Sequence, residues 1–240
     1  MNFQFCITDN SDLNMQIDRK TLCSAKAMSY DGFAYLWSGV RATYGATKGK
    51  VCFEVQITNN QSTDHLENEP NPHVLRCGFS VDSTSLILGA EPLSYGFGGT
   101  GKMSTNNKFL NYGKPFGYGD VIGCYLDMTV DPIQISYTIN GANMGVAFRI
   151  ARPELKGKAL YPHIMTKNQD FLVNFGQLPA PMCSLLPVFS PIGQLDENDG
   201  LVRGAKAPAT KKACEVIQMV GLPGNGHLST FIFWRKKVGT

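Results

Sequence analysis

Residues 133–148 read IQISYTINGANMGVAF, and this stretch decides the fold class. Apolar residues alternate with polar ones from Ile133 to Ile139, and this period of two places the apolar side chains on one face of a strand. The strand runs directly into Asn140 and Gly141, a pair that tolerates the positive φ angles of a tight type I′ turn. The residues NMGVAF then return as a second strand. The stretch therefore predicts an antiparallel β-hairpin.

The same pattern recurs on both sides of this hairpin. Residues 51–58 (VCFEVQIT) alternate between an apolar face and a mostly polar one. Further strand candidates, separated by Gly, Pro, Asn and Asp, are HVLRCGFS (73–80), VIGCYLDM (121–128) and FLVNF (171–175). Short strands with this spacing are typical of an antiparallel sandwich, so we expect an all-β protein.

Composition limits the size and the cellular setting of this sandwich. A chain of 240 residues with 43% hydrophobic content can bury one full-sized core and a fragment of a second domain. It lacks both a run of about 18 apolar residues and the residue order of a signal peptide, so we expect neither membrane insertion nor secretion. The seven cysteines are odd in number and contain no C-x-x-C pair, which favours reduced thiols in the cytosol or nucleus.

Charge is distributed unevenly along the chain. Residues 1–200 hold 15 Lys and Arg against 18 Asp and Glu, a net charge of −3. Residues 201–240 hold 7 against 1, a net charge of +6. The main body is therefore no basic cradle for nucleic acid. The tail could attract phosphate groups without sequence preference, although scattered basic residues on a solvated segment are the commoner explanation.

Two polar segments rich in Gly, Pro and Asn, residues 59–72 and 98–115, are interpreted as long loops that carry the binding site. Aromatic residues outside the long strands could line a recognition groove, although most are needed for the core. They are Tyr30, Phe33, Tyr35, Trp37, Tyr95, Phe97, Phe116 and Tyr118. The last four are our candidates for partner contact. Tyr95 and Tyr118 are favoured because the glycine after each leaves its ring without a shielding neighbour.

Catalytic and metal-binding patterns are missing from the sequence. No pair of carboxylates follows an apolar strand, and the four histidines, His65, His73, His163 and His227, lack metal-ligand spacing. We interpret His163 as a packed residue at a strand end, and Asp120 and Asp127 as turn caps. We therefore expect no catalytic residue, no metal and no cofactor.

Several stretches in order resemble a SPRY domain over about residues 1–178. They are YLWSGVRATYGATKGKVCFEVQI (35–57), RCGFS (76–80), YGFGG (95–99), GDVIGCYLDM (119–128), ISYTINGANMGVAF (135–148) and LYPHIMTKNQDFLVNFGQ (160–177). Together with LVRGAKAPATKKACEVIQMVGLPG (201–224), they resemble heterogeneous nuclear ribonucleoprotein U and its U-like relatives. In that family a SPRY domain precedes a short linker and a P-loop domain similar to polynucleotide kinases.

The resemblance implies a bent β-sandwich that binds protein segments through its loops and has no catalytic activity. It implies work in nuclear RNA processing or chromatin-associated assemblies, in the nucleus, with the cytoplasm as the alternative. RNA would be bound directly or through the assembly, while neither a membrane nor a small-molecule substrate is expected. The family's SAP-type DNA-binding segment and its Arg-Gly-Gly tract, to which RNA binding is mainly attributed, have no counterpart in this sequence.

The C-terminal part reads as a degenerate P-loop. Residues 216–230 (VIQMVGLPGNGHLST) keep Gly221, Gly224 and Gly226, but His227 and Leu228 stand where the family has Lys and Ser or Thr. His227 is too short to replace a lysine ammonium, and the leucine cannot bind Mg²⁺. We expect no ATP binding here, and a C-terminus that is truncated, alternatively spliced or misassigned as a gene model.

The sequence leaves three hypotheses for the function. The first is a non-enzymatic interaction module of the ribonucleoprotein U type. The alternative is a nucleotide-binding or phosphoryl-transfer protein with a residual P-loop, and a third is a SPRY module of another pathway, such as substrate recognition in a ubiquitin ligase.

The chain is divided into a SPRY domain (1–178), a Pro-rich and basic linker (179–212) and a remnant of a P-loop domain (213–240). Five prolines in residues 179–212 disfavour helix and sheet. The strand-like segment CEVIQMV (214–220) is expected to be isolated within a mostly irregular tail. We expect residues 1–178 to fold alone, with Leu185, Leu186, Val188 and Phe189 as candidates for packing back onto a sheet.

Overall fold

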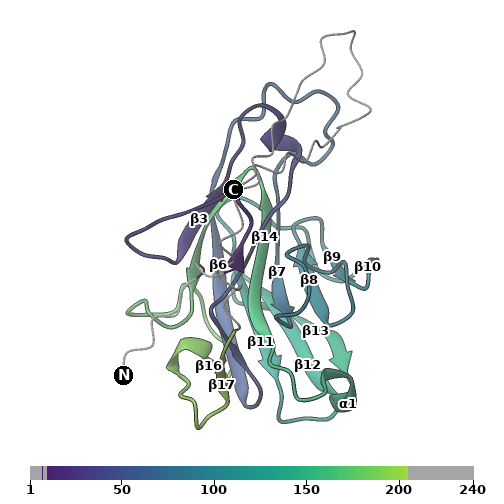
Figure 1. The fold of residues 1–240 in the computed structure, drawn as a ribbon, viewed down its shortest axis with the longest axis vertical. Coiled ribbons are helices and arrows are strands. Elements are labelled where there is room, and N and C mark those ends of the chain that lie inside the picture. The colour runs from purple at the N-terminus through teal and green to yellow at the C-terminus, as the bar shows by residue number, and fades with distance from the viewer. Residues whose placement is uncertain (1–6, 8–9, 205–240) are drawn as a thin grey trace, which may run out of the picture. The chain divides into compact units, whose positions relative to one another are not determined.

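The computed structural model describes residue 7 and residues 10–204, and these form a β-sandwich (Figure 1). The strands are β1 (Asn10–Ser11), β2 (Met15–Ile17), β3 (Ser24–Ala27), β4 (Ser38–Arg41), β5 (Tyr44–Ala46), β6 (Lys50–Asn60), β7 (Val74–Ser80), β8 (Ser94–Gly98), β9 (Lys102–Thr105), β10 (Lys108–Asn111), β11 (Val121–Asp127), β12 (Ile133–Ile139), β13 (Ala142–Ile150), β14 (Tyr161–Lys167), β15 (Gln169–Asn174), β16 (Ser190–Pro191) and β17 (Leu201–Arg203). Three short helices are η1 (Asp31–Tyr35), α1 (Arg152–Leu155) and η2 (Ile192–Gln194).

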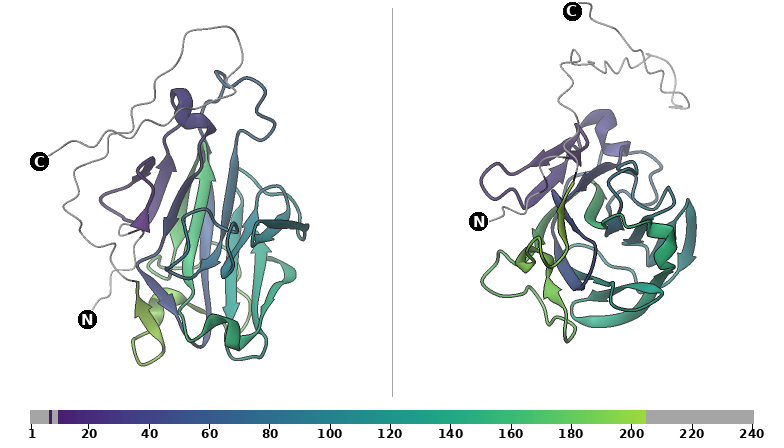
Figure 2. Two further views of the ribbon diagram at one scale, coloured as in Figure 1. Left: turned by 45° about the vertical axis from the view of Figure 1, so that its right-hand side comes forward. Right: turned by 60° about the horizontal axis from the view of Figure 1, so that its bottom comes forward.

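Two sheets make up the layers of the sandwich. One has the strand order β1-β4-β14-β7-β8-β9-β10. The other runs β13-β12-β11-β6-β15-β3-β2, with β16 added beside β6 and parallel to it. The end-on view in Figure 2 shows the strands arranged around a common interior. The expected antiparallel sandwich is confirmed, and each strand candidate between residues 51 and 175 overlaps a strand of the structure.

Alternating side chains from both sheets fill the core. Phe53 on β6 meets Phe79 on β7, and their ring centres lie 5.2 Å apart in an edge-to-face arrangement. Phe97 on β8 contacts Tyr137 on β12 at 5.1 Å between ring centres. These contacts join the two layers, because each pair has one ring from each sheet.

The hairpin at residues 133–148 forms as predicted. Asn140 and Gly141 separate β12 from β13 and have φ angles of 50° and 80°. The side-chain NH₂ group of Asn140 also donates to the Asp120 carboxylate at 2.7 Å, and the side-chain oxygen of Asn140 accepts from the backbone amide of Val121 at 2.8 Å. The turn is therefore fixed by its own geometry and by the start of β11.

The segment that follows β15 packs against the sandwich through residue 204, although we interpreted its sequence as the start of a linker. The Leu186 amide donates to the Tyr125 hydroxyl at 3.3 Å, and the Phe189 ring lies 5.1 Å from that of Tyr125. Ile192 and Leu201 are buried in the core. Pro-rich backbone can serve as a sheet edge where its missing N–H is not needed, and β16 uses it in this way. The compact unit reaches Lys206.

Several expectations lie outside the described residues. These are the strand-like segment 214–220, the degenerate P-loop and the remnant domain 213–240.

A buried arginine fastens the loop between β7 and β8, residues 81–93, to the outer face of the first sheet. Arg41 is only 2% exposed, and its guanidinium donates to the hydroxyl of Ser80 and to the carbonyls of Asp82, Thr84 and Ser85 at 2.8–3.1 Å. Since each of these acceptors is neutral, the arginine serves to fix the loop rather than to form an ion pair.

His163 on β14 completes this attachment. Its Nε2 lies 3.2 Å from the Leu86 carbonyl and its Nδ1 lies 2.8 Å from the Ser80 hydroxyl. Burial and the nearby Arg41 cation hold the pKa of His163 well below its usual range, so the ring is neutral. It donates from Nε2 and accepts at Nδ1. The interpretation of His163 as a packed strand residue is confirmed.

Candidate functional site

Arg76 lies on the outer face of the first sheet, beside two aromatic rings. Its guanidinium carbon is 5.4 Å from the centre of the Trp37 ring and 5.1 Å from that of Phe109. One of its Nη–H groups donates to the Leu88 carbonyl at 2.7 Å. Burial lowers the pKa of Arg76 to about 10, so the group remains a cation at neutral pH.

The glycines of β8 make room for this arginine. A Cβ atom at Gly96 would lie 2.6 Å from Cδ of Arg76, and one at Gly98 would lie 3.6 Å from its Nε. Phe97, between them, points into the core. The stretch YGFGG therefore gives an aromatic inner face and an outer face bare enough for the Arg76 stem to lie across it.

A pocket of about 210 Å³ opens beside Arg76. We call it the Arg76 pocket, and the side chains used below are Trp37, Glu69, Arg76, Lys102, Phe109 and Lys167. They come from five places in the chain: the residue before β4, the loop after β6, β7, the β9–β10 hairpin and the end of β14. The antiparallel topology, rather than local sequence, brings them together.

The two inner cations of the pocket differ in their partners. Lys167 forms an ion pair with Glu69 at 3.1 Å, and its Nζ lies 5.5 Å from the centre of the Trp37 ring. Among the ion pairs of the described residues, none includes Arg76. The pocket therefore holds one compensated cation and one uncompensated cation, with Lys102 exposed at its rim.

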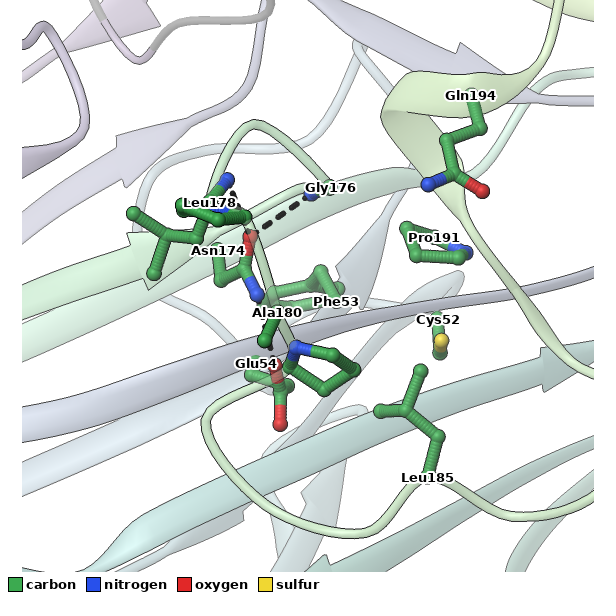
Figure 3. Close-up of a pocket in the computed structure, with 12 residues that line it drawn as sticks. Cys52, Phe53, Glu54, Asn174, Gly176, Leu178, Ala180, Leu185, Pro191 and Gln194 are labelled. Carbon is green, nitrogen blue, oxygen red and sulfur yellow. Dashed lines mark hydrogen bonds between the residues drawn. The ribbon is translucent and has the colours of Figure 1, made fainter.

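A second cavity, of about 190 Å³, lies between β6 and the segment after β15 (Figure 3). The buried carboxylate of Glu54 accepts hydrogen bonds from the Asn174 side chain at 2.8 Å and from the amides of Met182 and Cys183 at 2.9 Å. The segment after β15 forms one wall of this cavity. The hydrogen bonds to Glu54 attach that segment to β6 at Met182 and Cys183.

Two thiols near Glu54 are unsuited to nucleophilic chemistry. Burial raises the pKa of Cys52 to about 12, with further contributions from Glu54 and Cys183. Burial and the hydrogen bond to Glu54 raise the pKa of Cys183 to about 11. Both are protonated at neutral pH, and a protonated thiol is a poor nucleophile.

Ser80 and His163 likewise form no exposed catalytic pair. Both side chains are fully buried, and the histidine Nε2 is engaged with the Leu86 carbonyl. Asp120 and Asp127 accept hydrogen bonds from the nearby amides of Gly117 and Thr129, which confirms their interpretation as turn caps.

The structure buries three of the four aromatic candidates and exposes the fourth. Tyr95, Phe97 and Phe116 are buried, because the alternation along β8 and the chain before β11 turns their rings inward. Tyr118 is 66% exposed, and its partner contact stays a prediction. We expected the glycine after each tyrosine to leave the tyrosine ring exposed. Gly96 instead leaves room on the outer face of β8 for the Arg76 side chain.

The pocket residues were only partly anticipated. Trp37 was among the loop aromatics, and the segments 59–72 and 98–115 supply Glu69, Lys102 and Phe109. Segment 98–115 is a hairpin rather than a plain loop, since Asn106 and Asn107, with φ of 48° and 57°, form the turn between β9 and β10. Arg76 and Lys167 were missed. A charged residue at an outward position of an otherwise apolar strand was the available signal for Arg76.

These observations define a class of protein by its fold, an antiparallel β-sandwich of two sheets. The SPRY domain family model matches residues 50–178, and the chain belongs to the SPRY domain family. A crystal structure of a human SPRY domain has a TM-score of 0.52 and 18% identity, and covers 69% of this chain and 97% of that one. At this identity the likeness supports the fold.

Two relatives have much higher identity. Heterogeneous nuclear ribonucleoprotein U-like protein 2 of Homo sapiens is 40% identical over 230 residues, which is 96% of this chain and 30% of that protein. The ATP-dependent RNA helicase Ddx1 of Drosophila melanogaster is 40% identical over 142 residues, 59% of this chain and 18% of the helicase. The chain thus spans less than a third of the length of either relative.

Within residue 7 and residues 10–204, no helix is long and apolar enough to cross a membrane. In the same residues, no group of three or more His, Cys, Asp or Glu side chains is placed to hold a metal ion.

Proposed function

We propose that this chain is a non-enzymatic protein-interaction module of the heterogeneous nuclear ribonucleoprotein U-like type, acting in nuclear RNA processing or chromatin-associated assemblies. The observation that carries the proposal is the Arg76 pocket, in which a cation and two aromatic rings are presented together on a rigid sheet. Aromatic residues and arginine are the side chains most enriched at the centres of protein interfaces.

The rest of the described site supports recognition over catalysis. The thiols near Glu54 are protonated, and the Ser80–His163 pair is sealed in the sheet. The similarity to a ribonucleoprotein and to an RNA helicase supports work near RNA, and it also supports the nucleus as the site of action.

Phe109 gives the proposal a matched test. It is 48% exposed on β10 and lies in the pocket, whereas Leu110, beside it, is 58% exposed and does not line the pocket. Affinity purification from nuclear extract, with and without RNase, would compare the unchanged chain with Phe109→Ala and Leu110→Ala. We expect RNase-resistant protein partners that are lost with Phe109→Ala and kept with Leu110→Ala. Equal retention by both variants would contradict a role for this face.

A further inference from the structure

The Arg76 pocket is electrostatically incomplete. Burying a cation away from water is costly unless a counter-charge or enough hydrogen bonds compensate it. Arg41 meets this condition with five hydrogen bonds, four to the β7–β8 loop and one to the Ser80 hydroxyl on β7. Arg76, which is half-buried, donates to one acceptor among the described residues, the neutral carbonyl of Leu88. Arg76 lines the pocket, and its other guanidinium N–H groups have no acceptor among the described residues.

The geometry points to an anion as the missing partner. A guanidinium presents paired N–H groups in one plane, and these match the two oxygens of a carboxylate. The rings of Trp37 and Phe109 lie close to the Arg76 guanidinium and restrict its movement, which lowers the entropy lost on binding. The pocket, at about 210 Å³, is smaller than most cofactor sites and suits a single side chain.

We propose that the Arg76 pocket binds the carboxylate of a Glu or Asp side chain within an acidic peptide segment of a partner protein. This inference rests on the proposed function, because it names the chemistry of the protein that this face would bind. Arg76 supplies the bidentate contact. Lys102, on the rim, attracts acidic residues that flank the bound one.

A protein carboxylate is favoured over an RNA phosphate by the charges around the pocket. Nucleic acid strands are held by rows of phosphate contacts, whereas here Lys167 is already paired with Glu69, whose carboxylate opposes further phosphates. The residues before 201 carry a net charge of −3. Trp37 and Phe109, the rings on which bases would stack, are already occupied by Arg76.

The test uses the full 240-residue chain and a fluorescein-labelled, amidated peptide of about ten residues in which Glu alternates with Gly. A Gln-for-Glu peptide is the matched probe without charge, and an oligouridine of similar length is the RNA probe. Fluorescence anisotropy gives Kd for each. We expect the Glu peptide to bind at least about tenfold more tightly than the Gln peptide, and Arg76→Lys to weaken it by about tenfold although the charge is kept.

Two lysines on one hairpin provide the control. Lys102 lines the pocket and Lys108, on β10, does not. Lys102→Glu should weaken binding of the Glu peptide by about threefold or more, and Lys108→Glu should leave Kd unchanged. These exposed positions keep the test decisive if Arg76→Lys fails to fold.

Three results would overturn the inference. They are equal affinity for the Glu and Gln peptides, full affinity in a folded Arg76→Lys variant, or oligouridine that binds more tightly and displaces the Glu peptide. If Phe109→Ala loses its nuclear partners while the Glu peptide fails to bind, the interaction face stands and the acidic ligand is rejected.

Discussion

The Arg76 side chain on β7 fills the space that a side chain at Gly96 on the neighbouring strand β8 would need. A Cβ atom at position 96 would lie 2.6 Å from Cδ and 2.9 Å from Cγ of Arg76, and 2.9 Å from Cγ of Leu88. These separations are too short for a real contact, so the arginine can lie across β8 only because residue 96 has no side chain.

Gly96→Ala is therefore expected to displace Arg76 without touching the pocket itself. Affinity for the Glu peptide should fall by about fivefold or more, because the bidentate contact depends on position. Gly117→Ala is the control, since a Cβ atom there meets nothing within 4 Å. Anisotropy with both variants, after circular dichroism has shown them folded, gives the answer. Unchanged affinity in Gly96→Ala would mean that the guanidinium is not positioned by β8.

Replacement by methionine should cost much more stability at the buried Arg41 than at the half-buried Arg76. Arg41→Met leaves the carbonyls of Asp82, Thr84 and Ser85 without donors, and should lower the free energy of unfolding by about 3 kcal/mol or more. Arg76→Met removes an uncompensated cation and should change it by only about 1 kcal/mol in either direction. Urea denaturation measures both. A loss at Arg76 as large as that at Arg41 would show that its charge is already compensated.

His163 should make the protein less stable in acid. Its pKa is held well below 6.5 in the folded state by burial and by Arg41, while the unfolded chain has the ordinary value. The unfolded state therefore binds the extra proton first, and stability present above about pH 6.5 is lost as the pH falls below it. Between about pH 7 and pH 5 this costs at most about 2 kcal/mol, the value for a folded ring that takes up no proton in this range.

Replacing the imidazole isolates this contribution. In His163→Gln the free energy of unfolding should depend less steeply on pH over the same interval, by at most about 2 kcal/mol, because the titrating group is gone. Parallel slopes for the two proteins would mean that the folded histidine titrates normally.

The segment after β15 should be needed for stability. Removal of residues 179–206 exposes the surfaces that Ile192 and Leu201 cover and leaves the Glu54 carboxylate without the amides of Met182 and Cys183. A chain ending at residue 178 should have a free energy of unfolding lower by more than about 3 kcal/mol than a chain ending at Lys206. Equal urea midpoints for these two chains would support the boundary at 178 that the sequence suggested.

Local patterns in the sequence predicted the strands well. The period of two and the Asn140–Gly141 pair specified the hairpin because both are properties of adjacent residues. On β6 the same pattern placed Cys52 and Glu54 on a mostly polar face, yet both are buried. The residues that cover that face come from 128 and 129 positions further along the chain, at Met182 and Cys183, and alternation cannot reveal such a cover.

The candidate site was harder to predict for the same reason. Alternation assigns Arg76 to the outer face of β7, but it does not show that Trp37 and Phe109 from other elements meet it there. Tyr95 and Phe97 were predictable as core residues, since both alternate with glycines that cannot fill an interior. The same alternation places Gly96 and Gly98 on the outer face of β8, and this bare face is where the pocket lies.

Partners should contact the chain at the Arg76 pocket, and site-specific photo-crosslinking detects such a contact. Benzoylphenylalanine at position 109 keeps a phenyl ring beside Arg76, and the same residue at position 118 tests the exposed Tyr118. In nuclear extract we predict RNase-resistant protein adducts from position 109 that excess Glu peptide suppresses and excess Gln peptide leaves intact. Adducts from position 118 alone, or adducts from 109 that vanish with RNase, would show that protein partners do not bind at the Arg76 pocket.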